Sequence, residues 1–169
     1  MKVTIPDPAL VLLVGPAGAG KSTFAHAHFH GVEIVSSDHL RELLSNDPAD
    51  QAASAEAFKI LALLVEGRLK RRLTTVVDAT SLRAANRARY RAIASRHGIP
   101  VVAVAFDLSP STYHARNRGR AGRVVEAEVI DRQRELMQHA LAALPVEGYS
   151  ALYVIEDGGA AVVEVVRAT

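Results

Sequence analysis

The residues from 15 to 23 have the types and the spacing that bind a phosphate chain. Residues 15–22 match G-x-x-x-x-G-K-[ST] and Thr23 follows them, so the expected nucleotide-binding residues are Gly15, Pro16, Ala17, Gly18, Ala19, Gly20, Lys21, Ser22 and Thr23. Glycines let backbone N–H groups approach phosphate oxygens, and a helix beginning near Lys21 adds free amides. Lys21 is expected to reach the β- and γ-phosphates, and the Ser22 hydroxyl to ligate Mg²⁺. A Gly-rich turn can be only a turn, but the Lys-Ser pair and the preceding apolar run favour a site for ATP or another nucleoside triphosphate.

Two aspartates follow other apolar runs and could complete this site. Asp38 follows the run 32–36, and Arg41 lies three positions later, so both side chains can face one cleft. Asp38 could then accept a hydroxyl proton while Arg41 binds a phosphate of the acceptor, although Asp38 could also be a helix N-cap. Asp78 ends the run 74–78 and could hold Mg²⁺ through water, orient Ser22, or cap a helix.

Four arginines fall within eight positions of a Gly-containing stretch. They are Arg116, Arg118, Arg120 and Arg123, with Gly119 and Gly122 between them. Phosphoryl transfer spreads negative charge over the phosphate oxygens, and arginines on a closing loop stabilise that charge. We therefore expect a short Arg-rich lid over about 116–124. A solvated basic loop is the alternative.

Apolar runs alternate with helical segments along the whole chain. Strands are predicted over 9–14, 32–36, 74–78, 101–106 and 151–155. Helices are predicted over 21–29, 39–44, 51–72, 82–97 and 109–144, the last broken near residue 119. Residues 3–5 are too short to assign, and the tail 160–167 could be a helix or an edge strand, of which the helix is favoured. The strands are β-branched without polar alternation, which predicts one α/β domain over 1–169 with a parallel sheet of about five strands flanked by helices.

Composition excludes some classes of protein and leaves the acceptor open. The chain of 169 residues has no cysteine, so it has neither a disulfide framework nor a thiol nucleophile. No apolar run approaches the ~20 residues of a membrane-spanning helix, and we expect a cytoplasmic protein with no membrane partner. The net charge is +2, but the positive charge is concentrated in the middle segment of the chain. Residues 68–134 contain 15 Lys or Arg and five Asp or Glu. This excess suits a polyanion such as nucleic acid, although solvated helix faces give the same composition.

Five stretches together resemble the polynucleotide 5′-kinase domain of bacterial end-healing (RNA-repair) enzymes. They read LLVGPAGAGKSTFA, IVSSDHLRELLSND with DQ at 50–51, TVVDATS, VVAVAFDLS and HARNRGRAGR, and they span nearly the whole chain. The resemblance implies an adenylate-kinase-like P-loop fold. One departure is Ser81, where the family often has asparagine. The family's fused phosphatase, ligase or hydrolase modules are also absent from these residues, so we expect either an excised domain or a stand-alone kinase. Other end-healing or ligase modules are partner candidates.

The resemblance also implies a role for each matching residue. Lys21 and Ser22 would bind the triphosphate and Mg²⁺. Asp38 would be the general base on a 5′-hydroxyl, and Arg41 would contact the acceptor's phosphate. Arg116 and Arg123 would be lid arginines on the donor phosphates, with Arg120 beside them. The acceptor side would include Gln51, Thr80 and Val129.

These features favour a kinase that transfers the γ-phosphate of ATP or another NTP to the 5′-OH end of RNA or DNA. The first alternative is the same chemistry on a small hydroxylated metabolite, antibiotic or nucleotide sugar. The second is a non-catalytic NTP-binding switch. The switch is disfavoured because no guanine-specifying Asn-Lys-x-Asp is present, and an aromatic content of 5% is low for a base-stacking surface.

Overall fold

Five of the apolar runs form the parallel sheet that the sequence predicts, in the order β3-β4-β2-β5-β6. The computed structural model describes residues 1–119, 125–158 and 163–168. The strands of this sheet are β2 (Leu10–Val14), β3 (Ile34–Ser36), β4 (Thr75–Asp78), β5 (Val101–Phe106) and β6 (Ala151–Ile155). The helices are α1 (Lys21–His28), α2 (Ser37–Ser45), α3 (Ser54–Lys70), α4 (Ala84–Arg96), α5 (Pro110–Arg118) and α6 (Ala127–Ala143). The predicted α/β fold is confirmed, and the predicted helix over 51–72 is shorter at both ends.

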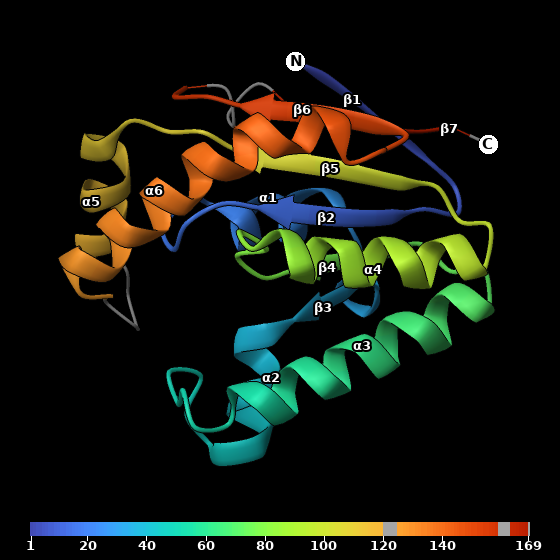
Figure 1. Cartoon of the computed structure of the whole chain (residues 1–169), viewed down its shortest axis with the longest axis horizontal. Coiled ribbons are helices and arrows are strands. Elements are labelled where there is room, and N and C mark those ends of the chain that lie inside the picture. Colours follow the sequence, from blue (N-terminus) through green and yellow to red (C-terminus); the bar gives the residue numbers. More distant parts are fainter. Residues whose placement is uncertain (120–124, 159–162, 169) are drawn as a thin grey trace.

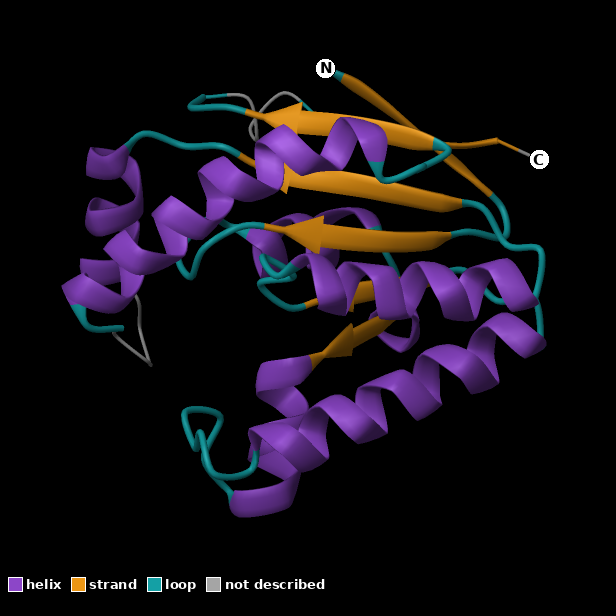
Figure 2. Cartoon of the chain, viewed as in Figure 1, coloured by secondary structure: helices purple, strands orange, loops and turns teal. Residues whose placement is uncertain are grey.

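Alternate residues of the central strand β2 pack against opposite layers of helices. Leu10 and Leu12 lie in a core cluster with α3 and α4, whereas Val11 and Leu13 lie in one with α1. The two layers are visible in Figures 1 and 2, where α3, α4 and α6 cover one face and α1 lies behind the other. All five residues of β2 are fully buried, which is why this strand is apolar throughout rather than alternating.

The small residues of β5 leave room for the long helix α6. Ala103 and Ala105 face Met137 and Leu144 in one cluster, whereas the larger Phe106 lies in the cluster with α1. Helix α6 can therefore approach the sheet closely and reach the edge at which the strands end. Figure 1 shows α6 crossing β5 and β6 toward α5 at that edge.

A second, two-stranded sheet joins the two ends of the chain. It pairs β1 (Lys2–Pro6) with β7 (Glu164–Ala168) in parallel, with Val3 opposite Val165. The prediction of a helix over 160–167 is therefore wrong for 164–167, and residues 159–162 lie outside the described residues. Val3 and Ile5 are fully buried on the α1 face of the main sheet, so tertiary packing rather than local propensity determines both strands.

None of the helices in residues 1–119, 125–158 and 163–168 has both the length and the hydropathy that a membrane-spanning helix needs.

Candidate active site

The loop between β2 and α1 needs glycine at two of its positions. Gly18 and Gly20 have φ angles of 81° and 91°, in the left-handed region that other residues rarely adopt. A Cβ on Gly18 would also lie 3.3 Å from the Tyr113 carbonyl oxygen, and one on Gly20 would lie 3.0 Å from Arg116 Nη1. Helix α1 begins at Lys21, directly after Gly20, so the loop joins a helix N-terminus as a phosphate site requires.

The side chain of Lys21 folds back along the start of this loop. Its Nζ donates hydrogen bonds to the carbonyl oxygens of Gly15 (2.8 Å) and Pro16 (2.7 Å), and the residue is 8% exposed. The N–H of Gly15 in turn donates to the carbonyl oxygen of Thr80 at 2.9 Å, which ties the loop to the segment after β4. The lysine is thus held beside the loop before any phosphate binds.

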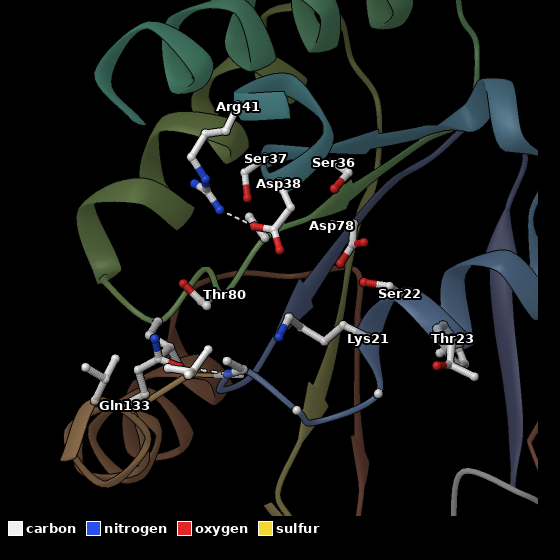
Figure 3. Close-up of a pocket in the computed structure, with 18 of the residues that line it drawn as sticks. Lys21, Ser22, Thr23, Ser36, Ser37, Asp38, Arg41, Asp78, Thr80 and Gln133 are labelled. Carbon is white, nitrogen blue, oxygen red and sulfur yellow. Dashed lines mark hydrogen bonds and ion pairs between the residues drawn. The ribbon is translucent and has the colours of Figure 1, made fainter. Parts of the chain in front are cut away.

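Ser22 and Asp78 present oxygen atoms suited to a magnesium ion. Ser22 is exposed in the first turn of α1, and Asp78 is the last residue of β4 at 7% exposure. Their side-chain oxygens face one another in Figure 3. The capping alternative for Asp78 does not hold, because α4 begins at Ala84 with Arg83 as its N-cap residue.

Magnesium at this place would complete its shell with phosphate oxygens and water. Among the described residues, no three His, Cys, Asp or Glu side chains gather to form a metal site of their own. Mg²⁺ in sites that bind substrate phosphates needs only one or two protein oxygens, so the Ser22–Asp78 pair fits this ion.

Asp38 lies in the first turn of α2, but it does not cap the helix. The cap is Ser36, whose hydroxyl accepts a hydrogen bond from the His39 N–H at 3.4 Å. The Asp38 carboxylate instead forms an ion pair with Arg41. Its side chain is 46% exposed, whereas that of Arg41 is only 7% exposed, so the carboxylate faces the cavity and the guanidinium lies behind it.

Arg41 is less available to an acceptor than the sequence implies. Its Nη2 is used by Asp38, and its Nε donates to the carbonyl oxygen of Pro48 at 2.9 Å. Arg41 thus orients the carboxylate and fixes the turn after α2. It still lines the cavity.

These side chains share one cavity of about 1020 Å³ with the predicted acceptor residues. Gln51, Thr80 and Val129 all line it, and they come from the turn before α3, the segment after β4, and α6. This volume is at the upper end of the range for small-molecule pockets. The prediction that these residues lie together agrees with the geometry. Their individual roles stay predictions.

Sequence reasoning missed several residues of the cavity wall. They are Phe58 on α3, Arg83 and Asn86 at the start of α4, and Arg132, Gln133 and Leu136 on α6. The residues of α4 and those of α6 could have been found from patterns in the sequence. Arg83 and Asn86 follow shortly after the predicted strand end at Asp78, and the α6 residues repeat at helical spacing with Val129.

Part of the predicted Arg-rich lid can be placed. Arg116 lies in the last turn of α5 and its Nη1 donates to the carbonyl oxygen of Ala19 at 3.0 Å, so it contacts the phosphate-binding loop directly. Arg118 is exposed, and Arg120 and Arg123 lie outside the described residues. Asn117 bonds both backbone groups of Val125, at 2.7 and 2.9 Å, and so joins α5 to the residues before α6.

Several arginines of the basic middle third stabilise the fold instead of facing a ligand. Arg87 is 1% exposed and donates to Glu147 at 2.9 and 2.5 Å and to the carbonyl oxygens of Ser81 and Leu82. These hydrogen bonds hold the pKa of the Glu147 carboxyl below its usual value. Arg68 likewise donates to residues 74 and 75. The charge excess in the sequence therefore overstates the positive charge at the cavity.

A glycine-rich loop that leads into a helix, a lysine beside it, and a carboxylate across the same cavity define a P-loop site that binds the phosphates of a nucleotide. A family model described as an AAA domain, AAA_33, matches residues 10–142, and the chain belongs to this family.

Solved structures with the same fold include a chain of an RNA repair complex and a gluconokinase. A chain of the Pnkp1/Rnl/Hen1 RNA repair complex matches with a TM-score of 0.69 and 20% identity, over 82% of this chain and 46% of that one. A gluconokinase from Sinorhizobium meliloti 1021 matches with a TM-score of 0.56 and 20% identity, over 91% and 85%. At these identities the matches show the fold alone.

One curated protein shares only a short stretch with the chain. The sn-glycerol-3-phosphate import ATP-binding protein UgpC 1 of Rhizobium etli is 40% identical over 55 residues, which is 30% of this chain and 16% of that protein.

Proposed function

We propose that the chain is a Mg²⁺-dependent kinase that transfers the γ-phosphate of ATP or another NTP to the 5′-hydroxyl end of RNA or DNA. The observation that carries the proposal is one cavity in which the Asp38 carboxylate faces the phosphate-binding loop and in which Arg83, Arg116 and Arg132 add positive charge along the walls. A carboxylate suits a hydroxyl that must lose its proton, and separated arginines suit an acceptor that carries several phosphates.

The residues present account for each part of the reaction. Asp38 accepts the proton of the acceptor hydroxyl while the hydroxyl oxygen forms a bond to the γ-phosphorus. The bond between the γ-phosphorus and the β–γ bridging oxygen breaks, and the nucleoside diphosphate leaves. Lys21 and Arg116, both at the loop, stabilise the charge on the phosphate oxygens. Ser22 and Asp78 would hold Mg²⁺, which neutralises charge on the phosphates when bound.

The resemblance to end-healing kinases and the match to a chain of an RNA repair complex support the nucleic-acid acceptor. In a repair pathway the product, a 5′-phosphate end, is the substrate of a ligase. Other end-healing or ligase modules are therefore the partners that this proposal implies.

A small polyhydroxylated acceptor is the second candidate. The cavity wall also carries uncharged hydrogen-bonding side chains, Gln51, Ser54 and Asn86, of the kind that bind sugar hydroxyls. The gluconokinase match supports this candidate.

Transfer of labelled γ-phosphate separates the two candidates. The wild-type protein and Lys21→Ala are incubated with Mg²⁺, labelled ATP, and either a 5′-OH oligonucleotide or one of a panel of sugars and nucleotide sugars. The proposal expects label on the oligonucleotide with the wild type and none with the variant. Label on a sugar and none on the oligonucleotide would establish the second candidate instead.

A further inference from the structure

A side chain of α6 reaches across to the phosphate-binding loop. The Oε1 atom of Gln133 accepts a hydrogen bond from the backbone N–H of Ala17 at 2.7 Å, although the two residues are 116 positions apart. Figure 3 shows the Gln133 carboxamide against the loop, on the side where Lys21 and Thr80 also lie. The N–H groups of such a loop are the groups that bind phosphate, so a side chain that contacts one of them lies next to the place where the phosphates bind.

The contact with Ala17 fixes which way the carboxamide points. A backbone N–H can only donate, so the atom that faces it is the carbonyl oxygen, and the Nε2 group with its two donors points elsewhere. Gln133 is half-buried and lines the cavity. No acceptor contacts its Nε2 anywhere in the described ranges. The protein therefore holds an oriented hydrogen-bond donor at the cavity wall.

The position of Lys21 shows which phosphate would lie nearby. Its Nζ donates hydrogen bonds to the carbonyl oxygens of Gly15 and Pro16, the two residues that precede Ala17 in the sequence. Because the lysine of such a loop contacts the β- and γ-phosphates, the segment 15–17 marks the γ end of the phosphate chain, whereas Ser22 at the start of α1 marks the metal side. Gln133 contacts the loop at its γ end.

The same helix also forms the acceptor wall. Val129, Arg132 and Leu136 lie one turn or less from Gln133 and line the cavity with it. Gln133 is thus at the junction between the donor phosphates and the acceptor side, where a transferred group must pass.

We propose that Gln133 is a further catalytic residue, whose Nε2 donates a hydrogen bond to the phosphoryl group during its transfer. The Ala17 N–H orients the carboxamide, so the donor is in place before the reaction and costs no reorganisation. Gln133 takes up and releases no proton. Its hydrogen bond strengthens as the phosphate oxygens gain charge. The inference rests on phosphoryl transfer at this site, and it does not depend on which acceptor is used.

Gln133→Glu tests the donor while keeping the bond to Ala17. A carboxylate oxygen still accepts from the Ala17 N–H, but the donor is lost and a negative charge faces the γ-phosphate. Gln138→Glu, at an exposed position on the same helix, is the matched control. We expect Gln133→Glu to bind ADP within about 3-fold of wild type. We expect it to bind a non-hydrolysable ATP analogue at least 10-fold more weakly, because only the triphosphate carries the γ-phosphate. Its transfer rate should fall by about 10²-fold, as on removal of one donor to a developing anion.

Two results would overturn the proposal. The first is an ATP-analogue affinity and a rate both within about 3-fold of wild type, which would mean that Nε2 is not used. The second is an equal loss of ADP and ATP-analogue affinity, together with a lower melting temperature. That result would mean that Gln133 only stabilises the contact between α6 and the loop. Both binding measurements are made without an acceptor, and the rate is also read as slow transfer to water. A wrong assignment of the acceptor would therefore leave this test unaffected.

Discussion

Replacing Asp38 by asparagine should remove the proposed general base and leave the fold and nucleotide binding intact. The asparagine oxygen can still accept from Arg41, and the Asp38 side chain is 46% exposed, so we expect the free energy of unfolding to change by less than about 1 kcal/mol. The transfer rate should fall by about 10²–10⁴-fold, the usual contribution of a positioned base, which is about 3–5 kcal/mol of activation free energy.

The assay follows transfer of labelled γ-phosphate at saturating ATP, with ATP-analogue affinity measured in parallel. Glu42→Gln is the matched control, because Glu42 lies on the same helix, is exposed and pairs with His39 instead of a cavity residue. A rate within about 3-fold of wild type in Asp38→Asn would show that the carboxylate is not the base. A loss of nucleotide affinity equal to the loss of rate would also refute the reasoning, since Asp38 would then act in donor binding.

Three further predictions concern the phosphate-binding loop, the buried ion pair of Arg87 with Glu147, and two arginines that line the cavity. Gly18→Ala should weaken nucleotide binding at least 10-fold, because alanine disfavours φ of 81° by about 1–2 kcal/mol and its Cβ meets a carbonyl of α5; equilibrium binding measures this. Glu147→Gln should lower the free energy of unfolding by about 3 kcal/mol in urea titration, because it leaves the buried Arg87 without a carboxylate. Arg83→Ala and Arg132→Ala should each weaken binding of an oligonucleotide acceptor and reduce the slope of log affinity against log salt by about one, measured from 50 to 200 mM salt.

Each of these predictions has a control or a contradicting outcome. Gly67→Ala, where an added Cβ has room, should leave nucleotide affinity unchanged. Because the folded-state pKa of Glu147 is lowered, its contribution to stability is present above its usual pKa of 4.5 and is lost as the pH falls below that value. Glu147→Gln should therefore flatten the acid limb of the stability curve, and an unchanged acid limb would contradict the assignment. A salt slope that neither arginine variant changes would argue against phosphate contacts by these residues.

Local patterns in the sequence were enough to predict the sheet and the phosphate-binding loop. The strands at 101–106 and 151–155 were predicted with their observed bounds, because each is a buried apolar run between turns. The glycine spacing of 15–20 predicted the strand–loop–helix unit, since only glycine fits the φ angles at positions 18 and 20.

Features that depend on contacts between distant residues could not be predicted in this way. The pairing of β1 with β7 joins residues about 160 positions apart, and nothing local distinguishes β7 from a short helix. The hydrogen bond between Gln133 and Ala17 and the burial of Arg87 against Glu147 likewise depend on where α6 and α4 cross the sheet. For that reason, the basic composition of residues 68–134 could not show which arginines stabilise the fold and which line the cavity.

The most direct test of the proposed function compares two oligonucleotides that differ only at the 5′ end. The wild-type protein is given Mg²⁺, labelled ATP and equal amounts of the 5′-hydroxyl and 5′-phosphorylated forms of one short strand. The proposal predicts label on the 5′-hydroxyl form alone, at a rate that Asp38→Asn lowers by about 10²–10⁴-fold. Consumption of ATP with no label on either strand, together with label on a small hydroxylated compound added to the same reaction, would contradict it.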